Sequence, residues 1–177
     1  MNQDAILADY LGMELVLNRR EQENVAYFGF CAAGEFRLQR CTHCGLLRYP
    51  PGPSCPWCTG RGAEWVPVEG RGTVHSYMEV HQAIQPAFRA LAPFMILLVD
   101  LDTQRGRPGE HEALRVIGNL VRPDGTIAST DYSRRVGIGS RVRMVFTPLA
   151  EGLALPQWTI DDNAAQPPAP WRYPEPT

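Results

Sequence analysis

The chain has 177 residues, of which 44% are hydrophobic and 20% are charged, a composition that is ordinary for a globular protein. This composition excludes a mainly disordered chain and a collagen-like one. All 17 basic residues are arginine, and the 19 acidic residues bring the net charge to −2. Schiff-base chemistry on lysine and a P-loop lysine are therefore excluded, and a large phosphate-binding surface is disfavoured.

Residues 1–34 are predicted to form an N-terminal helical segment. Four apolar side chains follow the i, i+3, i+4 spacing of one helical face: Ile6, Leu7, Tyr10 and Leu11. A second helix is expected from Glu21 to Cys31, and Gly34 would end it. Cys31 lies among apolar residues of that helix, so we expect a buried core residue rather than a reactive thiol.

Residues 35–62 form a block rich in Cys, Pro and Gly with the spacing C-x2-C-x10-C-x2-C. Its cysteines are Cys41, Cys44, Cys55 and Cys58. Each C-x2-C pair can form a tight turn that points two thiolates at one centre, and four sulfurs are the tetrahedral ligand set of structural zinc. Because four thiolates leave no open coordination position, the metal would stabilise the fold rather than activate water.

Two other interpretations of the cysteine pairs stay open at this point. A rubredoxin-like iron site uses the same ligand set. A thioredoxin-like redox pair is disfavoured, since no βαβ pattern surrounds either pair. His43 lies between two of the cysteines and is expected to be a solvent-facing residue.

From residue 64 the pattern becomes β. The candidate strands are Glu64–Val68, Thr73–Val80, Phe94–Asp102, Ala113–Val121, Arg141–Thr147 and Gln157–Ile160. Gly- and Pro-containing turn signals separate them, which indicates a small closed barrel or a sandwich. Residues 163–177 contain five prolines, so this tail is either a loose end or an extended arm that Trp171 and Tyr173 could dock.

The longest apolar run, Phe94 to Val99, is much shorter than the roughly 20 residues of a membrane-spanning helix. The first ten residues are acidic and lack the basic flank and apolar stretch of a secretory signal. We therefore expect a cytoplasmic protein that has no membrane partner.

Common catalytic signatures such as G-x-S-x-G, H-E-x-x-H and the P-loop do not occur. His75 and His81 are six residues apart, which places them on one face of an extended strand. They are candidates for acid–base chemistry, although ordinary surface positions are the simpler interpretation. The same simpler interpretation applies to Asp100 and Asp102. We assign no catalytic residue. The apolar stretch 81–93 either caps the protein's own core or forms a contact surface.

Several motifs together resemble the acyl-CoA-associated family first catalogued as domain of unknown function number thirty-five. They are Phe36-Arg-Leu-Gln-Arg-Cys41-x-x-Cys44-Gly45, Arg48-Tyr-Pro-Pro51, Cys55-Pro-x-Cys58, Gly70-Arg-Gly-Thr-Val-His-Ser-Tyr77, Pro93-Phe94 with Asp100-Leu-Asp102, and Gly139 before Arg141-Val-Arg-Met-Val145. The resemblance covers about residues 22–160.

The resemblance implies a mainly β fold with N-terminal helices. Residues 1–34 would be helical, 35–66 a rubredoxin-like zinc ribbon, 67–162 a five-stranded OB-fold barrel, and 163–177 a Pro-rich C-terminal tail. The metal ligands carried over are Cys41, Cys44, Cys55 and Cys58, and the expected cofactor is one structural zinc ion.

Members of this family assemble with thiolase-like or lipid-transfer-protein-like enzymes. In these complexes the enzyme chain holds the catalytic residues. The resemblance therefore implies a non-catalytic subunit of an acyl-CoA thiolase or aldolase, in a hetero-tetramer. A CoA thioester is expected at the interface with the partner, where Arg48, Arg71 and Arg89 are candidates for its phosphates.

Two rival functions are kept. A zinc ribbon with an OB-fold also suits a nucleic-acid-binding module, although the negative net charge and the lack of lysine disfavour it. The other rival is a stand-alone catalyst that uses His75 or His81, or an electron carrier that holds iron.

Overall fold

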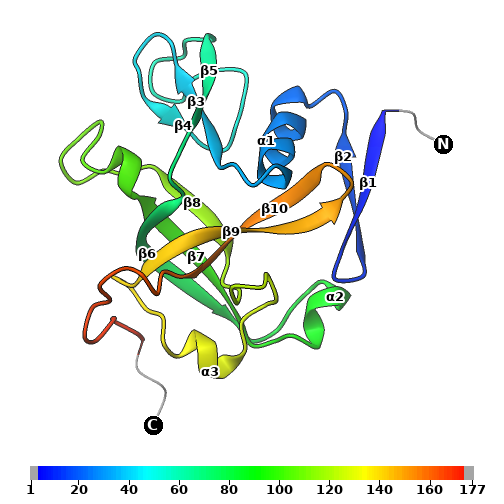
Figure 1. Cartoon of the computed structure of the whole chain (residues 1–177), viewed down its shortest axis with the longest axis vertical. Helices are drawn as coiled ribbons and strands as arrows, with labels where there is room; N and C mark the ends of the chain where they lie inside the picture. The colour runs from blue at the N-terminus through cyan, green and yellow to red at the C-terminus, as the bar shows by residue number, and fades with distance from the viewer. Residues whose placement is uncertain (1–3, 174–177) are drawn as a thin grey trace. The chain divides into compact units, whose positions relative to one another are not determined.

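The structure is a computed structural model that describes residues 4–173. Ten strands dominate the described range. They are β1 (Ala5–Tyr10), β2 (Met13–Asn18), β3 (Arg37–Cys41), β4 (Leu47–Arg48), β5 (Ala63–Pro67), β6 (Arg71–Val80), β7 (Phe94–Leu101), β8 (Arg115–Asn119), β9 (Arg141–Ala150) and β10 (Leu153–Ile160). The helices are α1 (Gln22–Ala32), α2 (Pro86–Arg89), α3 (Thr130–Ser133) and one 3-10 turn (Asp102–Gln104). Figure 1 shows their course along the chain.

The prediction of an N-terminal helix before residue 20 is wrong, because β1 and β2 form an antiparallel hairpin there. Leu11 and Gly12 make its two-residue turn, both with positive φ, at 58° and 79°. Such turns match the twist of paired strands. Apolar side chains occur on both faces of the hairpin, and this dense pattern also satisfies helical spacing. The second predicted helix is confirmed as α1, and Gly34 follows it with a φ of 77°.

A five-stranded sheet with the order β10-β9-β6-β7-β8 contains five of the six candidate strands, and β5 is the sixth. Alternate residues of β7 point into the core and are fully buried: Met95, Leu97, Val99 and Leu101. One parallel bridge joins Leu120, just after β8, to Trp158 in β10. The mainly β class and the OB-fold strand set are as the sequence indicates.

The chain forms two compact units, and each consists of three separate segments. The first contains residues 1–69, 103–114 and 146–156, and the second contains 70–102, 115–145 and 157–177. The segment boundaries expected after residues 34, 66 and 162 stay a prediction. Among residues 4–173, no helix has both the length and the apolar composition for crossing a membrane.

Candidate functional site

Four cysteine side chains converge beside the small sheet β4-β3-β5, which belongs to the first unit. Cys41 ends β3, and the other three lie in the loops that join the strands of this sheet. The four sulfur atoms all lie within 4.8 Å of one another. Cys41 and Cys58 have their Sγ atoms 3.6 Å apart, and Cys44 and Cys55 have theirs at the same separation. The spacing of the two pairs in the sequence therefore predicted which residues meet.

The first cysteine pair lies in the turn that joins β3 to β4. Cys41 is the last residue of β3, its N–H donates to Leu46 O at 2.9 Å, and its carbonyl accepts from Gly45 N at 2.9 Å. Gly45 has a φ of 74°, the left-handed region that glycine adopts without a Cβ penalty. This tight turn brings Cys44 back to the side of Cys41.

The second pair repeats this geometry in the loop before β5. Cys55 N donates to Gly60 O at 2.8 Å, and Thr59 N donates to Cys55 O at 2.9 Å. A Cβ on Gly60 would lie 3.3 Å from the Cys58 sulfur and 3.1 Å from the His43 Cβ. Glycine at position 60 thus keeps space between the two turns.

The geometry and chemistry of the four sulfurs fit a tetrahedral divalent cation. Zinc–sulfur bonds of about 2.3 Å correspond to sulfur–sulfur separations of about 3.8 Å in a tetrahedron, close to the 3.6 Å observed. The backbone N–H groups of Cys44 and His43 lower the pKa of the Cys41 thiol to about 6, which favours the thiolate. Several thiolates this close repel one another strongly unless a cation lies between them.

Buried polar side chains support the base of this ribbon. The Gln39 Oε1 atom accepts hydrogen bonds from Arg48 Nε and from Gly52 N, each at 2.9 Å. Arg48 is only 2% exposed, so it cannot serve as the phosphate ligand considered from the sequence. Gln104, from the 3-10 turn far along the chain, accepts from Leu47 N at 2.6 Å. No sequence motif around either residue predicts the contact between Gln104 and Leu47.

Cys31, the fifth cysteine, is a buried core residue, as predicted. Its side chain is 1% exposed on α1, and burial raises the pKa of the thiol to about 12. The thiol stays protonated at neutral pH, so it is a poor nucleophile and a poor metal ligand.

The candidate acid–base histidines do not form one group. A register shift in β6 makes His75 an extra residue between two paired positions, Val74 with Val99 and Ser76 with Leu98. This bulge breaks the alternation from which a shared face was inferred for His75 and His81. The His75 ring lies 3.2 Å from Asp100, whose other oxygen accepts from Arg115 Nε at 3.0 Å.

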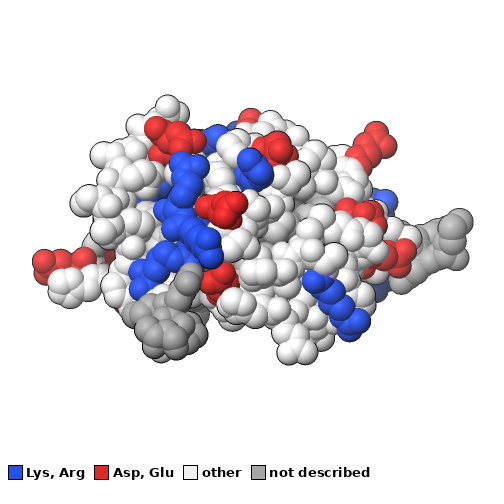
Figure 2. Space-filling model, turned by 90° about the horizontal axis from the view of Figure 1, so that it is seen from below, with Lys and Arg blue, Asp and Glu red and all other residues white. Residues whose placement is uncertain are grey.

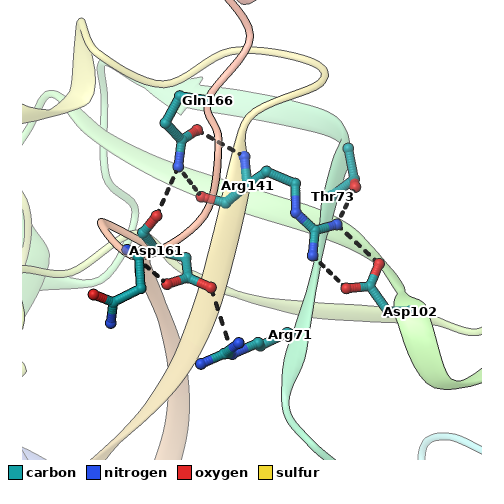
Figure 3. Close-up of polar contacts among 7 residues, drawn as sticks. Arg71, Thr73, Asp102, Arg141, Asp161 and Gln166 are labelled. Atoms are coloured by element: carbon teal, nitrogen blue, oxygen red, sulfur yellow. Dashed lines mark hydrogen bonds and ion pairs between the residues drawn. The ribbon is translucent and has the colours of Figure 1, made fainter.

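Asp102 and Arg141 form a two-pronged ion pair inside the second unit (Figure 3). Arg141 Nη1 donates to Asp102 Oδ1 at 2.8 Å and to Thr73 Oγ1 at 2.7 Å. The pair connects β9 to the end of β7 and to β6. Asp102 is therefore a structural carboxylate rather than a free surface group.

Asp161 lies beside this pair and is completely buried (Figure 3). Its Oδ2 atom is 3.5 Å from Arg71 Nε, so Arg71 holds a structural contact in place of an open phosphate site. Gln166 of the tail donates to the carbonyl oxygens of Arg141 and Asp161, at 3.0 and 2.9 Å. Gln166 thus fixes this part of the tail on β9, which favours an extended arm over a loose end for the described tail residues.

The loop 81–93 has features of both roles considered from the sequence, a cap on the protein's own core and a contact surface. Phe88 packs on Phe94 with ring centroids 5.1 Å apart, which covers part of the core. Ile84 is 89% exposed. Arg89 is also exposed, and its Nη2 donates to Ile84 O at 3.4 Å.

Two family models match adjacent parts of the chain. One, described as "ChsH2, rubredoxin-like zinc ribbon domain", covers residues 28–64, and the other, described as "ChsH2, C-terminal OB-fold domain", covers residues 65–147. The chain belongs to the ChsH2 family, also called DUF35. Its zinc ribbon and OB-fold follow each other in the order that the sequence resemblance implied.

Among solved structures, the chain is similar to one described as "Ltp2-ChsH2(DUF35) aldolase". The two share 29% sequence identity with a TM-score of 0.58, over 77% of this chain and 93% of that chain.

Two curated relatives are named as alpha subunits of hydratases. A probable enoyl-CoA hydratase alpha subunit of Thermomonospora curvata is 40% identical over 96 residues, which are 53% of this chain and 27% of the relative. A 3-oxo-4,17-pregnadiene-20-carboxyl-CoA hydratase alpha subunit of Mycobacterium tuberculosis is 29% identical over 86% of this chain and 41% of the relative. The chain thus spans less than half the length of these curated relatives.

Proposed function

We propose that this chain is a non-catalytic, zinc-binding subunit that assembles with a thiolase-like enzyme acting on acyl-CoA thioesters. The similarity to a chain of the Ltp2-ChsH2 aldolase, over 93% of that chain, carries the proposal. The family models of the ribbon and the OB-fold, which together match residues 28–147, support the same proposal. In the proposed assembly the partner performs the bond cleavage, and this chain supports assembly and the handling of the CoA thioester.

Zinc is the proposed occupant of the four-cysteine cluster. Cys41, Cys44, Cys55 and Cys58 supply four sulfurs, which fill the coordination sphere of a structural ion and leave no place for water or substrate. The ion would therefore hold the two turns together. A rigid ribbon of this kind presents a fixed surface although its hydrophobic core is small.

The polar groups considered for catalysis instead support an accessory role. Asp102 pairs with Arg141, and Asp100 is shared between His75 and Arg115. Each of these carboxylates is held by a cation in the fold, an arrangement typical of structural ion pairs. The proposal therefore places the reacting groups on the partner.

Co-expression with thiolase-like chains from the source genome tests the proposal. We expect one of them to co-purify in equal molar amount as a hetero-tetramer with two copies of each chain, and the complex to contain one zinc per copy of this chain. The isolated chain should show no turnover of acyl-CoA. Failure of every thiolase-like chain to co-purify, or turnover by the isolated chain, would contradict the proposal.

The loop 81–93 is the proposed contact with that partner. Ile84 of this loop is exposed, whereas Phe88 already packs on the chain's own core. Replacing Ile84 with Asp should reduce co-purification, while Val16→Asp, an equally polar change at an exposed hairpin position, should leave it intact. Equal behaviour of the two variants would remove the loop from the interface.

A hydratase chain is the second candidate partner, because both curated relatives are named hydratase alpha subunits. The same co-expression with hydratase chains of the source genome distinguishes the two. Co-purification with a hydratase chain in place of a thiolase-like chain would favour this alternative.

A further inference from the structure

A depression of about 650 Å³ lies within the second unit. Its walls come from β6 and the residue after it, from α3 and the segment that follows α3, and from the last described residues of the tail. This volume falls inside the range of roughly 300–1,000 Å³ that small-molecule sites occupy.

The tail that forms one wall is firmly attached. Trp171 and Ile138 exchange two backbone hydrogen bonds, at 2.8 and 3.1 Å. Arg172 Nη1 donates to Ser133 O at 2.7 Å and to Val136 O at 2.6 Å. Tyr173 N donates to the Tyr77 hydroxyl at 2.7 Å. The wall is therefore built into the fold.

Two aromatic rings of the tail remain open to a ligand. Trp171 is 55% exposed and Tyr173 is 75% exposed, although both line the depression. Large exposed aromatic side chains that gather in one concave place are unusual on a surface that has no binding role. Their flat faces suit stacking against a planar ring.

The charged groups of the depression differ in how far they are already used. Arg172 lies over the Tyr77 ring at 5.5 Å and also contacts Glu79 at 3.5 Å, so its charge is balanced. Arg134 lines the depression and is exposed, and no side chain among residues 4–173 pairs with it. Figure 2, which views the side that carries α3 in Figure 1, shows basic side chains gathered in a band.

We propose that this depression binds a planar aromatic anion of the size of a nucleoside monophosphate. The ring stacks on Trp171 and Tyr173, and the phosphate accepts hydrogen bonds from the Arg134 guanidinium and the Thr130 hydroxyl. The site lies within one unit, so binding does not require a partner chain and goes beyond the proposed function.

Calorimetric titration of the full chain with AMP tests this site. We expect saturable binding that is at least about 10-fold tighter than that of adenosine or inorganic phosphate, because each lacks one of the two recognised groups. Arg134→Gln should weaken AMP binding about 10-fold or more, and Trp171→Ala about 5-fold or more. Trp171→Phe, which keeps a ring, should restore part of the loss.

Arg122→Gln is the matched control, since Arg122 is exposed and does not line the depression. It should leave AMP binding unchanged, and thermal melts should show that all variants stay folded. The proposal is overturned if AMP gives no saturable binding, if inorganic phosphate binds as tightly as AMP, or if the Arg134 and Trp171 variants bind like the wild-type chain.

Discussion

The Asp102–Arg141 ion pair should contribute more to stability than the exposed Arg40–Glu64 pair, although both consist of two short hydrogen bonds. The side chains of Arg141 and Asp102 are 24% and 33% exposed, whereas those of Arg40 and Glu64 are 49% and 54% exposed. Hydrogen bonds to charged groups contribute about 1.5–3 kcal/mol where water is largely excluded. Fully exposed ion pairs contribute about 0–1 kcal/mol.

Asp102→Asn keeps the shape of the side chain and removes its charge, so we expect a loss of about 2 kcal/mol. At about 2–4 °C per kcal/mol for a chain of this length, the melting temperature should fall by about 4–8 °C. Glu64→Gln should lower it by about 4 °C at most. Circular dichroism melts of the three proteins at pH 7 measure both values. Equal shifts for the two variants would refute the argument that burial sets the strength of the pair.

Three further predictions concern the ribbon, the tail and α1. Cys55→Ser should abolish zinc binding and the ribbon fold, because structural zinc contributes about 10–16 kcal/mol; elemental analysis and near-ultraviolet circular dichroism measure this, and a retained zinc ion would contradict the assignment. Gly137→Ala should detach the tail, since its Cβ would collide with Trp171 O, whereas Gly52→Ala has free space; hydrogen exchange of residues 163–173 should rise only in the first. Burial raises the pKa of Cys31 from 9.0 to about 12, so this thiol's contribution is complete below pH 9 and is lost as the pH rises toward 12. Urea unfolding from pH 8 to 10 should show this decline, and a decline of the same steepness in Cys31→Ala would assign it to other groups.

The four-cysteine cluster was predictable because its information is local. Two C-x2-C pairs each fold into a turn of a few residues, so spacing alone identifies the four cysteines that the structure brings together. The strands after residue 63 were equally predictable from the sequence, since alternating apolar residues and Gly- or Pro-containing turns mark them. Cys31 was predictable from its apolar neighbours for the same reason.

Prediction from the sequence failed where one pattern of apolar residues suits both a helix and a hairpin. It also failed where a feature depends on contacts between residues far apart in the sequence. Leu7 and Leu11 fit a helical face, but Leu11 occupies a left-handed turn position beside Gly12. Because that turn reverses the chain, the segment forms a hairpin instead of a helix. The bulge at His75 depends on pairing with β7. The anchoring of the tail through Gln166 depends on a contact 25 residues away in the sequence, which no local motif encodes.

The interleaving of the two compact units limits how the molecule can be dissected. A fragment that stops at residue 69 would leave behind residues 103–114 and 146–156, which complete the same unit. Limited proteolysis at a single loop would therefore yield two incomplete pieces rather than two folded domains. Exchange of the ribbon between homologues would need three coordinated segment replacements to preserve the packing of its own unit.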